Sequence, residues 1–211
     1  MTQRIYRIFF LLFIVAGSIR LSAQTPNSDF GAWIISSDLE ETTFTEDGED
    51  LTIAFEKRNG YGFSFNHFWT ERFSTEIAAQ TFGGDMTATS DFGGAAFTVD
   101  IGELDAIALS AMAQYHFKRA SRFSPYVGAG VARLSGDFEA INDPDNLESF
   151  DLESEITWAA SVGANIQLTE NLFLAADFKY IPWSAVAEND PDSESLDIDP
   201  SLLSIGVKVR F

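Results

Sequence analysis

The chain has 211 residues, no cysteine and a formal net charge of −19, with 32 acidic side chains against 13 basic ones. The length suits one domain, and the lack of cysteine excludes disulfides and lipid attachment through cysteine. The excess of carboxylates argues against nucleic acid as a partner, because phosphate would be repelled.

The first 23 residues have the layout of a secretory signal peptide. Two arginines precede the apolar run Ile8 to Gly17, and small residues follow up to a cleavage site expected after Ala23. The run is shorter than the ~20 residues that a membrane-spanning helix needs. We therefore expect residues 1–23 to be removed and residues 24–211 to form the mature domain. A retained anchor is the alternative, which no later apolar segment supports.

Alternation of apolar and polar side chains predicts β-strands along the rest of the chain. Six segments alternate clearly, and two more do so less clearly. The clear segments are 61–66, 73–80, 107–117, 156–167, 172–180 and 203–211, and the other two lie near 29–36 and 123–134. The count is eight strands.

The connections between these segments alternate in length and charge. Short turns are expected at 69–72, 118–122 and 169–171, whereas 26 of the 32 acidic side chains fall in the longer segments 38–59, 82–103, 136–155 and 187–199. We expect these acidic segments to be loops. Tight turns at one end and long loops at the other are typical of an outer-membrane barrel, with the tight turns in the periplasm.

A soluble eight-stranded barrel, such as a lipocalin, is the structural alternative. Such a barrel would expose a highly charged polar face to water, but here the polar positions are mainly Ser, Gly, Ala, Asn, Gln and Thr. The opposite face carries aromatic residues near strand ends, as interfacial girdles do: Tyr61, Tyr115, Phe117, Tyr180 and Phe211. The sequence therefore predicts an all-β, eight-stranded, antiparallel, transmembrane up-and-down β-barrel in the lipid of the bacterial outer membrane.

The last strand ends on an aromatic residue at the C-terminus. Its apolar positions include Val207, Val209 and Phe211, and the pattern resembles the terminal signature by which outer-membrane barrels are recognised for insertion. We expect these three residues to be the insertion signal, with the barrel-assembly machinery as a partner. An ordinary edge strand is the alternative.

Charged side chains on the polar face nearly balance. Glu76 and Asp177 stand against Lys179, Lys208 and Arg210. Because an unpaired ion inside a narrow lumen is costly, we expect an inward ion-pair network that fixes the register between neighbouring strands. Replacing Asp177 by Ala is expected to leave Lys179 without its partner. A proton or ion path is the functional alternative.

Enzymatic activity is not expected. Only His67 and His116 are available as bases, and the His-x-Ser pattern of lipid A deacylases is absent. We expect neither a cofactor nor a dedicated metal site. The repeated turns 142–145 and 189–192, both Asn-Asp-Pro-Asp, are candidate ligands for divalent cations but lack the spacing of an EF-hand. A solvated, repulsive surface is the alternative.

Three segments resemble the OmpW family of small outer-membrane proteins. They are 68–76 with its turn and inward Glu, 124–131 with Pro-Tyr-Val-Gly-Ala-Gly, and 168–181 with its turn and Asp-x-Lys-Tyr. The resemblance implies a narrow lumen with a hydrophobic passage for small apolar molecules and a lateral exit to the bilayer. Ile181, Trp183 and Leu202 are the apolar inward positions that suit such a passage. Ordinary side-chain packing, in a nonconducting structural or receptor barrel that acts through its acidic loops, is the alternative.

Overall fold

The structure is a computed structural model that describes residues 27–46, 49–92, 95–118, 121–140, 150–186 and 196–211. The expected signal peptide, 1–23, lies outside these residues. No helix in the described ranges is long and apolar enough to cross a membrane.

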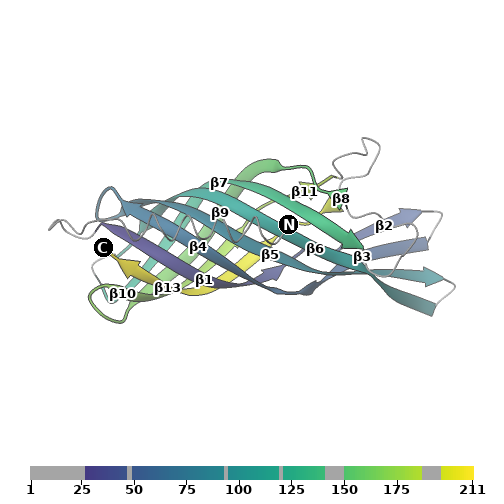
Figure 1. Cartoon of the computed structure of the whole chain (residues 1–211), viewed down its shortest axis with the longest axis horizontal. Helices are drawn as coiled ribbons and strands as arrows, with labels where there is room; N and C mark the ends of the chain where they lie inside the picture. The colour runs from purple at the N-terminus through teal and green to yellow at the C-terminus, as the bar shows by residue number, and fades with distance from the viewer. Residues whose placement is uncertain (1–26, 47–48, 93–94, 119–120, 141–149, 187–195) are drawn as a thin grey trace.

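Eight strands close into an antiparallel ring, and each pairs with the next along the chain (Figure 1). The last ring strand pairs with the first and closes the cylinder. The eight are β1 (Ser28–Asp38), β4 (Asn59–Phe68), β5 (Phe73–Phe92), β6 (Ala95–His116), β7 (Phe123–Ala140), β9 (Glu155–Gln167), β10 (Leu172–Tyr180) and β13 (Ser201–Arg210). The predicted eight-stranded up-and-down barrel is confirmed, including the two strands with weak alternation.

The wall of the barrel is apolar outside and mostly polar inside its periplasmic half. Ile34, Ile77 and Ile156 are 60%, 62% and 72% exposed on the outer face, whereas Ser204 and Lys208 on β13 are each 1% exposed. A band of exposed isoleucine, leucine and valine around a closed barrel is stable only in an apolar solvent. With its apolar side chains on the outer face, the structure excludes the alternative of a soluble eight-stranded barrel.

Several strands continue far beyond the membrane. β5 has 20 residues and β6 has 22, whereas a tilted strand crosses the bilayer with about 9–11. Two further strands, β2 (Thr42–Glu46) and β3 (Glu49–Lys57), extend this sheet beside β5, at the right of Figure 1. The prediction that 38–59 and 82–103 are loops was therefore wrong. Their backbone groups pair in a ladder, and their many carboxylates are tolerated because this part of the sheet stands in water.

Three short strands complete the extracellular end. β8 (Phe150–Asp151) pairs with β7, and β11 (Ser184–Ala185) pairs with β12 (Leu196–Asp197). The β7–β8 pair sets Asp137 directly opposite Asp151. Burial raises the pKa of the Asp137 carboxyl, and the charges of Asp151 and Glu139 raise it further.

We expect Asp137→Asn to stabilise the β7–β8 pair at neutral pH. Because the folded-state pKa of Asp137 is raised, the fold favours the protonated carboxyl, so stability is greatest at low pH and is lost as the pH rises through that pKa. The neutral amide should regain about 0.2–1 kcal/mol, the usual size of a cross-strand pair, measured as amide hydrogen exchange of β7 and β8 at acidic and neutral pH. Asp100→Asn is the control, since Asp100 faces Thr87. Equal effects of the two variants would contradict this account.

Candidate functional site

The lumen has two sections along the barrel axis. The polar section, toward the periplasm, contains Asp29, Glu76, Tyr126, Asp177, Lys179, Lys208 and Arg210. The apolar section, toward the extracellular end, contains Ile35, Phe82, Leu104, Leu134, Ile181, Trp183 and Leu202. Alternation of side chains turns the members on the ring strands inward, whereas Ile181 and Trp183 follow β10 and are buried in the same cluster.

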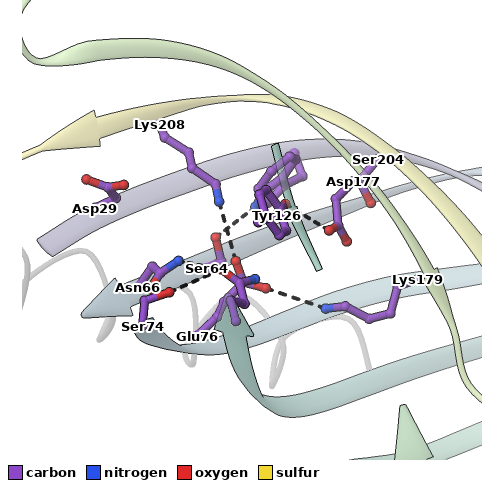
Figure 2. Close-up of polar contacts among 12 residues, drawn as sticks. Asp29, Ser64, Asn66, Ser74, Glu76, Tyr126, Asp177, Lys179, Ser204 and Lys208 are labelled. Atoms are coloured by element: carbon purple, nitrogen blue, oxygen red, sulfur yellow. Dashed lines mark hydrogen bonds and ion pairs between the residues drawn. The ribbon is translucent and has the colours of Figure 1, made fainter. Parts of the chain in front are cut away.

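Glu76 is the centre of the polar section (Figure 2). Its Oε1 lies 3.7 Å from Lys179 Nζ, and its Oε2 lies 3.5 Å from Lys208 Nζ. Glu76 is 3% exposed and the two lysines are 1% exposed. In the ring order β5 stands opposite β10 and three places from β13. The Glu76 pairs therefore connect distant walls across the lumen, and for Glu76, Lys179 and Lys208 the expectation that they join neighbouring strands was wrong.

Both lysines have further partners that help to replace water. Lys179 Nζ donates to Gln80 Oε1 at 2.8 Å and to Ser110 Oγ at 3.1 Å. Lys208 Nζ lies 5.0 Å from the centre of the Trp33 ring and 5.3 Å from that of Tyr126, at the distance of a cation–π interaction. Each buried ammonium is thus held by a carboxylate and by other groups.

Asp177 has a different partner from the one expected. Tyr126 Oη donates a 2.8 Å hydrogen bond to Asp177 Oδ2 (Figure 2), while the carboxylate paired with Lys179 is that of Glu76. Tyr126, Gly163 and Asp177 lie in one register row on β7, β9 and β10. A Cβ at Gly163 would lie 2.5 Å from Tyr126 Cζ, so glycine is needed there to let the tyrosine ring cross β9.

Arg210 forms a separate pair near the periplasmic end. Its Nε donates to Asp29 Oδ1 at 2.7 Å and its Nη2 to Asp29 Oδ2 at 3.2 Å. The guanidinium lies 4.1 Å from the Phe173 ring centre and 5.5 Å from that of Phe68. Asp29 and Arg210 are register partners on β1 and β13, so this pair lies across the closing ladder. The inward position of Asp29 could not be predicted from the sequence, because its strand has weak alternation.

Histidines and further polar groups occupy the periplasmic end of the wall. His116 Nε2 lies 2.9 Å from Ser74 Oγ inside the barrel, and Asn66 Nδ2 donates to Gln114 Oε1 at 2.7 Å. His67 Nδ1 lies 3.0 Å from Ser28 Oγ. Within the described ranges, no group of three or more His, Cys, Asp or Glu is arranged to hold a metal ion. The acidic turns 142–145 and 189–192 lie outside those ranges.

The apolar section is filled by side chains from all around the ring. Trp183 is 1% exposed, and its ring meets that of Phe82 edge to face at a centroid distance of 6.1 Å. A Cβ at Gly136 would lie 3.1 Å from Trp183 Cη2, so the indole reaches across to β7. Ile181 and Leu202 are fully buried in the same cluster.

Asp199 holds the segment that carries Trp183. Its Oδ1 accepts a 2.9 Å hydrogen bond from the Trp183 backbone N–H, and its Oδ2 accepts one of 2.7 Å from Tyr180 Oη. Its own φ of 38° is in the left-handed region, which aspartate tolerates better than most residues. The two contacts turn the chain inward directly after β10 ends.

The hydrogen-bonded ladder between β9 and β10 is shorter than the ladder between β9 and β7. The last β9–β10 register pair is Ala160 with Tyr180, yet β9 remains paired with β7 as far as Glu155. Beyond Tyr180 the chain contains Pro182, and the next hydrogen bond to β9 is from Ser184 N–H to Glu155 Oε2 at 3.1 Å. We call residues 155–159 of β9 and 181–183 the β9–β10 seam.

The C-terminal residues expected to signal insertion lie on the outer face. Val207 and Val209 point to the lipid side of β13, and the Phe211 ring lies 6.4 Å from that of Phe65. Their role in insertion stays a prediction.

The closed ring, its apolar outer face and the polar section of its lumen define an eight-stranded β-barrel of the bacterial outer membrane. The family model of the OmpW family matches residues 31–211, and the chain belongs to that family. The resemblance predicted from three short segments is confirmed, and so is the outer-membrane location.

Relatives and solved structures agree with this assignment. The chain is 27% identical over 202 residues to the outer membrane protein AlkL of Ectopseudomonas oleovorans, covering 90% of this chain and 86% of the relative. Its fold is similar to the crystal structure of OprG from Pseudomonas aeruginosa, with a TM-score of 0.69, 14% identity and coverage of 89% and 97%. The solid-state NMR structure of AlkL gives a TM-score of 0.56 at 20% identity, with coverage of 92% and 94%.

We expect Glu76→Gln to destabilise the barrel strongly. The change removes the one carboxylate within 4.0 Å of Lys179 and Lys208 in the described part of the lumen, and breaking a buried pair by removing one partner costs about 3–5 kcal/mol. Denaturant unfolding in detergent micelles, followed by tryptophan fluorescence, measures the loss.

Asp38→Asn is the matched control, because the Asp38–Lys57 pair is 65% and 62% exposed and an exposed pair contributes about 0–1 kcal/mol. An unchanged midpoint for Glu76→Gln would show that the two lysines do not depend on this carboxylate.

Proposed function

We propose that the barrel admits small apolar molecules from outside the cell into the apolar section and releases them sideways into the bilayer through the β9–β10 seam. The observation that carries this proposal is the division of the lumen, with buried apolar side chains above a polar section rich in ion pairs. Membership of the OmpW family supports the same function, since the family resemblance implies a hydrophobic passage.

Passage of an apolar solute through the polar section would be energetically unfavourable. A solute that continued toward the periplasm would have to separate Glu76 from its lysines and Asp29 from Arg210. Removing a partner from a buried ion pair is strongly unfavourable. An exit above this level is therefore required if the apolar section receives a solute.

The β9–β10 seam is at the right height for such an exit. Ile181 and Trp183 of the apolar section lie directly after β10, where the ladder to β9 ends. Pro182 has no backbone N–H and cannot donate to β9. On the outer face the rings of Trp158 and Tyr180 approach to 5.7 Å, so apolar groups flank the seam on both sides of the wall.

A nonconducting structural or receptor barrel is the second candidate. The complete burial of Ile181, Trp183 and Leu202 favours it, since these side chains fill the section that a solute would enter. In that case the extracellular strands and acidic segments would act on partners, among them divalent cations.

We expect Trp183→Ala to increase passage of an apolar solute, because the indole crosses the lumen from the end of β10 to β5 and β7. Proteoliposomes with lipopolysaccharide in the outer leaflet would take up an apolar fluorescent probe faster with this variant than with the wild type, by several-fold. Ion conductance in planar bilayers should stay low for both proteins, because the ion pairs remain in place.

Trp158→Ala is the matched control. Trp158 is 56% exposed on the lipid side, so this substitution should leave uptake of the probe unchanged. Uptake no faster than in protein-free liposomes, for the wild type and for Trp183→Ala alike, would favour the structural barrel.

A further inference from the structure

Basic side chains without a carboxylate partner gather at the periplasmic rim. Across the described ranges, five basic residues lie within 4.0 Å of a carboxylate: Lys57, Arg58, Lys179, Lys208 and Arg210. The other four are Arg72, Lys118, Arg122 and Arg133. In a chain with more than twice as many acidic as basic side chains, the three unpaired cations at one end need an explanation.

Arg72, Lys118 and Arg122 belong to two neighbouring turns. Arg72 ends the β4–β5 turn, and the other two belong to the β6–β7 turn. The turns are adjacent because β5 and β6 pair, with Phe73 opposite Tyr115, and the His116 N–H donates to the Arg72 carbonyl at 2.7 Å. We call these three cations the rim patch.

A cluster of aromatic rings lies directly below the rim patch on the outer face. The Tyr115 ring centre is 5.1 Å from that of Phe73 and 5.2 Å from that of Phe117. Phe73 and Phe117 are both large exposed side chains. Aromatic residues at the end of a membrane barrel mark the level of the lipid headgroups, so the rim patch lies at that level.

Tyr115 connects the aromatic cluster to the charge. Its Oη accepts a 3.2 Å hydrogen bond from Arg72 Nη1, which holds the guanidinium against the outer wall. Among the described residues no carboxylate lies within 4.0 Å of Arg72, so its remaining N–H groups are available to an acceptor from outside the protein. Glu71 is the one acidic residue in the described part of the two turns, and it lies within 4.0 Å of none of the three cations.

We propose that the rim patch binds the headgroup of an anionic phospholipid in the periplasmic leaflet, with the acyl chains against Phe73, Tyr115 and Phe117. Three cations without protein carboxylates complement a phosphodiester, and the exposed aromatic rings suit the chains attached to it. A soluble acidic protein would match the cations but not the rings. This inference is independent of solute passage.

The test is lipid binding by the whole mature protein in a nonionic detergent, measured by native mass spectrometry with phosphatidylglycerol and with phosphatidylcholine of the same chains. We expect selective retention of phosphatidylglycerol. Replacing Arg72, Lys118 and Arg122 by Gln should weaken it roughly fivefold for each cation removed, since each contributes about 1 kcal/mol near an anionic surface. The loss should shrink at high salt.

Arg133→Gln is the matched control, because Arg133 is also exposed and has no carboxylate partner among the described residues, but lies on the extracellular side, where it donates to Ser154 Oγ. Tyr115→Phe keeps the ring and should weaken binding less than Arg72→Gln does. Soluble glycerol phosphate should compete poorly, because it lacks chains. The proposal is overturned if the triple variant retains phosphatidylglycerol like the wild type, if Arg133→Gln loses as much, or if phosphatidylcholine binds equally well.

Discussion

Closure of the backbone ladder is the constraint on which the rest of this structure depends. Within lipid every N–H and C=O must be paired inside the protein, which only a closed ring of strands can achieve for a β protein. The β1–β13 ladder completes that ring, and the Asp29–Arg210 pair lies across it in register. The same constraint makes the early end of the β9–β10 ladder notable, because irregular backbone at membrane depth is tolerated only where protein buries it or where it lines a water-filled cavity.

A closed ring of eight strands leaves a lumen that side chains can fill, and this chain fills its two sections differently. In the polar section, Glu76 reaches from β5 toward lysines on β10 and β13, so that charge holds distant walls together. In the apolar section, the residues after β10 turn inward under the control of Asp199. The boundary between the two sections of the lumen lies near Lys179 and Ile181, where the hydrogen-bonded ladder between β9 and β10 also ends. The lumen side chains therefore change from polar to apolar at the same height along the barrel axis at which the pairing of β9 with β10 ends.

Much of the fold could be predicted from the sequence because strand alternation is local. The alternation also identified the inward charges, but it contains no information on which walls face each other, so Glu76 could not be matched to Lys179 in advance. The three segments that carry the family resemblance contribute Glu76, Tyr126 and Asp177, which meet in the polar section. Tyr126 reaches Asp177 only because Gly163 lies between them in register. The long extracellular strands could not be predicted, because dense carboxylates occur both in loops and in strands that stand in water.

The distribution of charge follows from the orientation of the barrel. Carboxylates collect in the extracellular sheet, where water solvates them, and Arg58 alone faces Asp85, Glu103 and Asp105 there. The lumen cannot tolerate such an excess, and its charges balance, with Asp29, Glu76 and Asp177 against Lys179, Lys208 and Arg210. In the described part of the short periplasmic turns, the cations Arg72, Lys118 and Arg122 outnumber the acidic residues Glu71 and Glu170, and none of the three cations lies within 4.0 Å of a carboxylate. An outer-membrane barrel with this arrangement presents opposite charge to its two surroundings, and its two rims should therefore respond to salt independently.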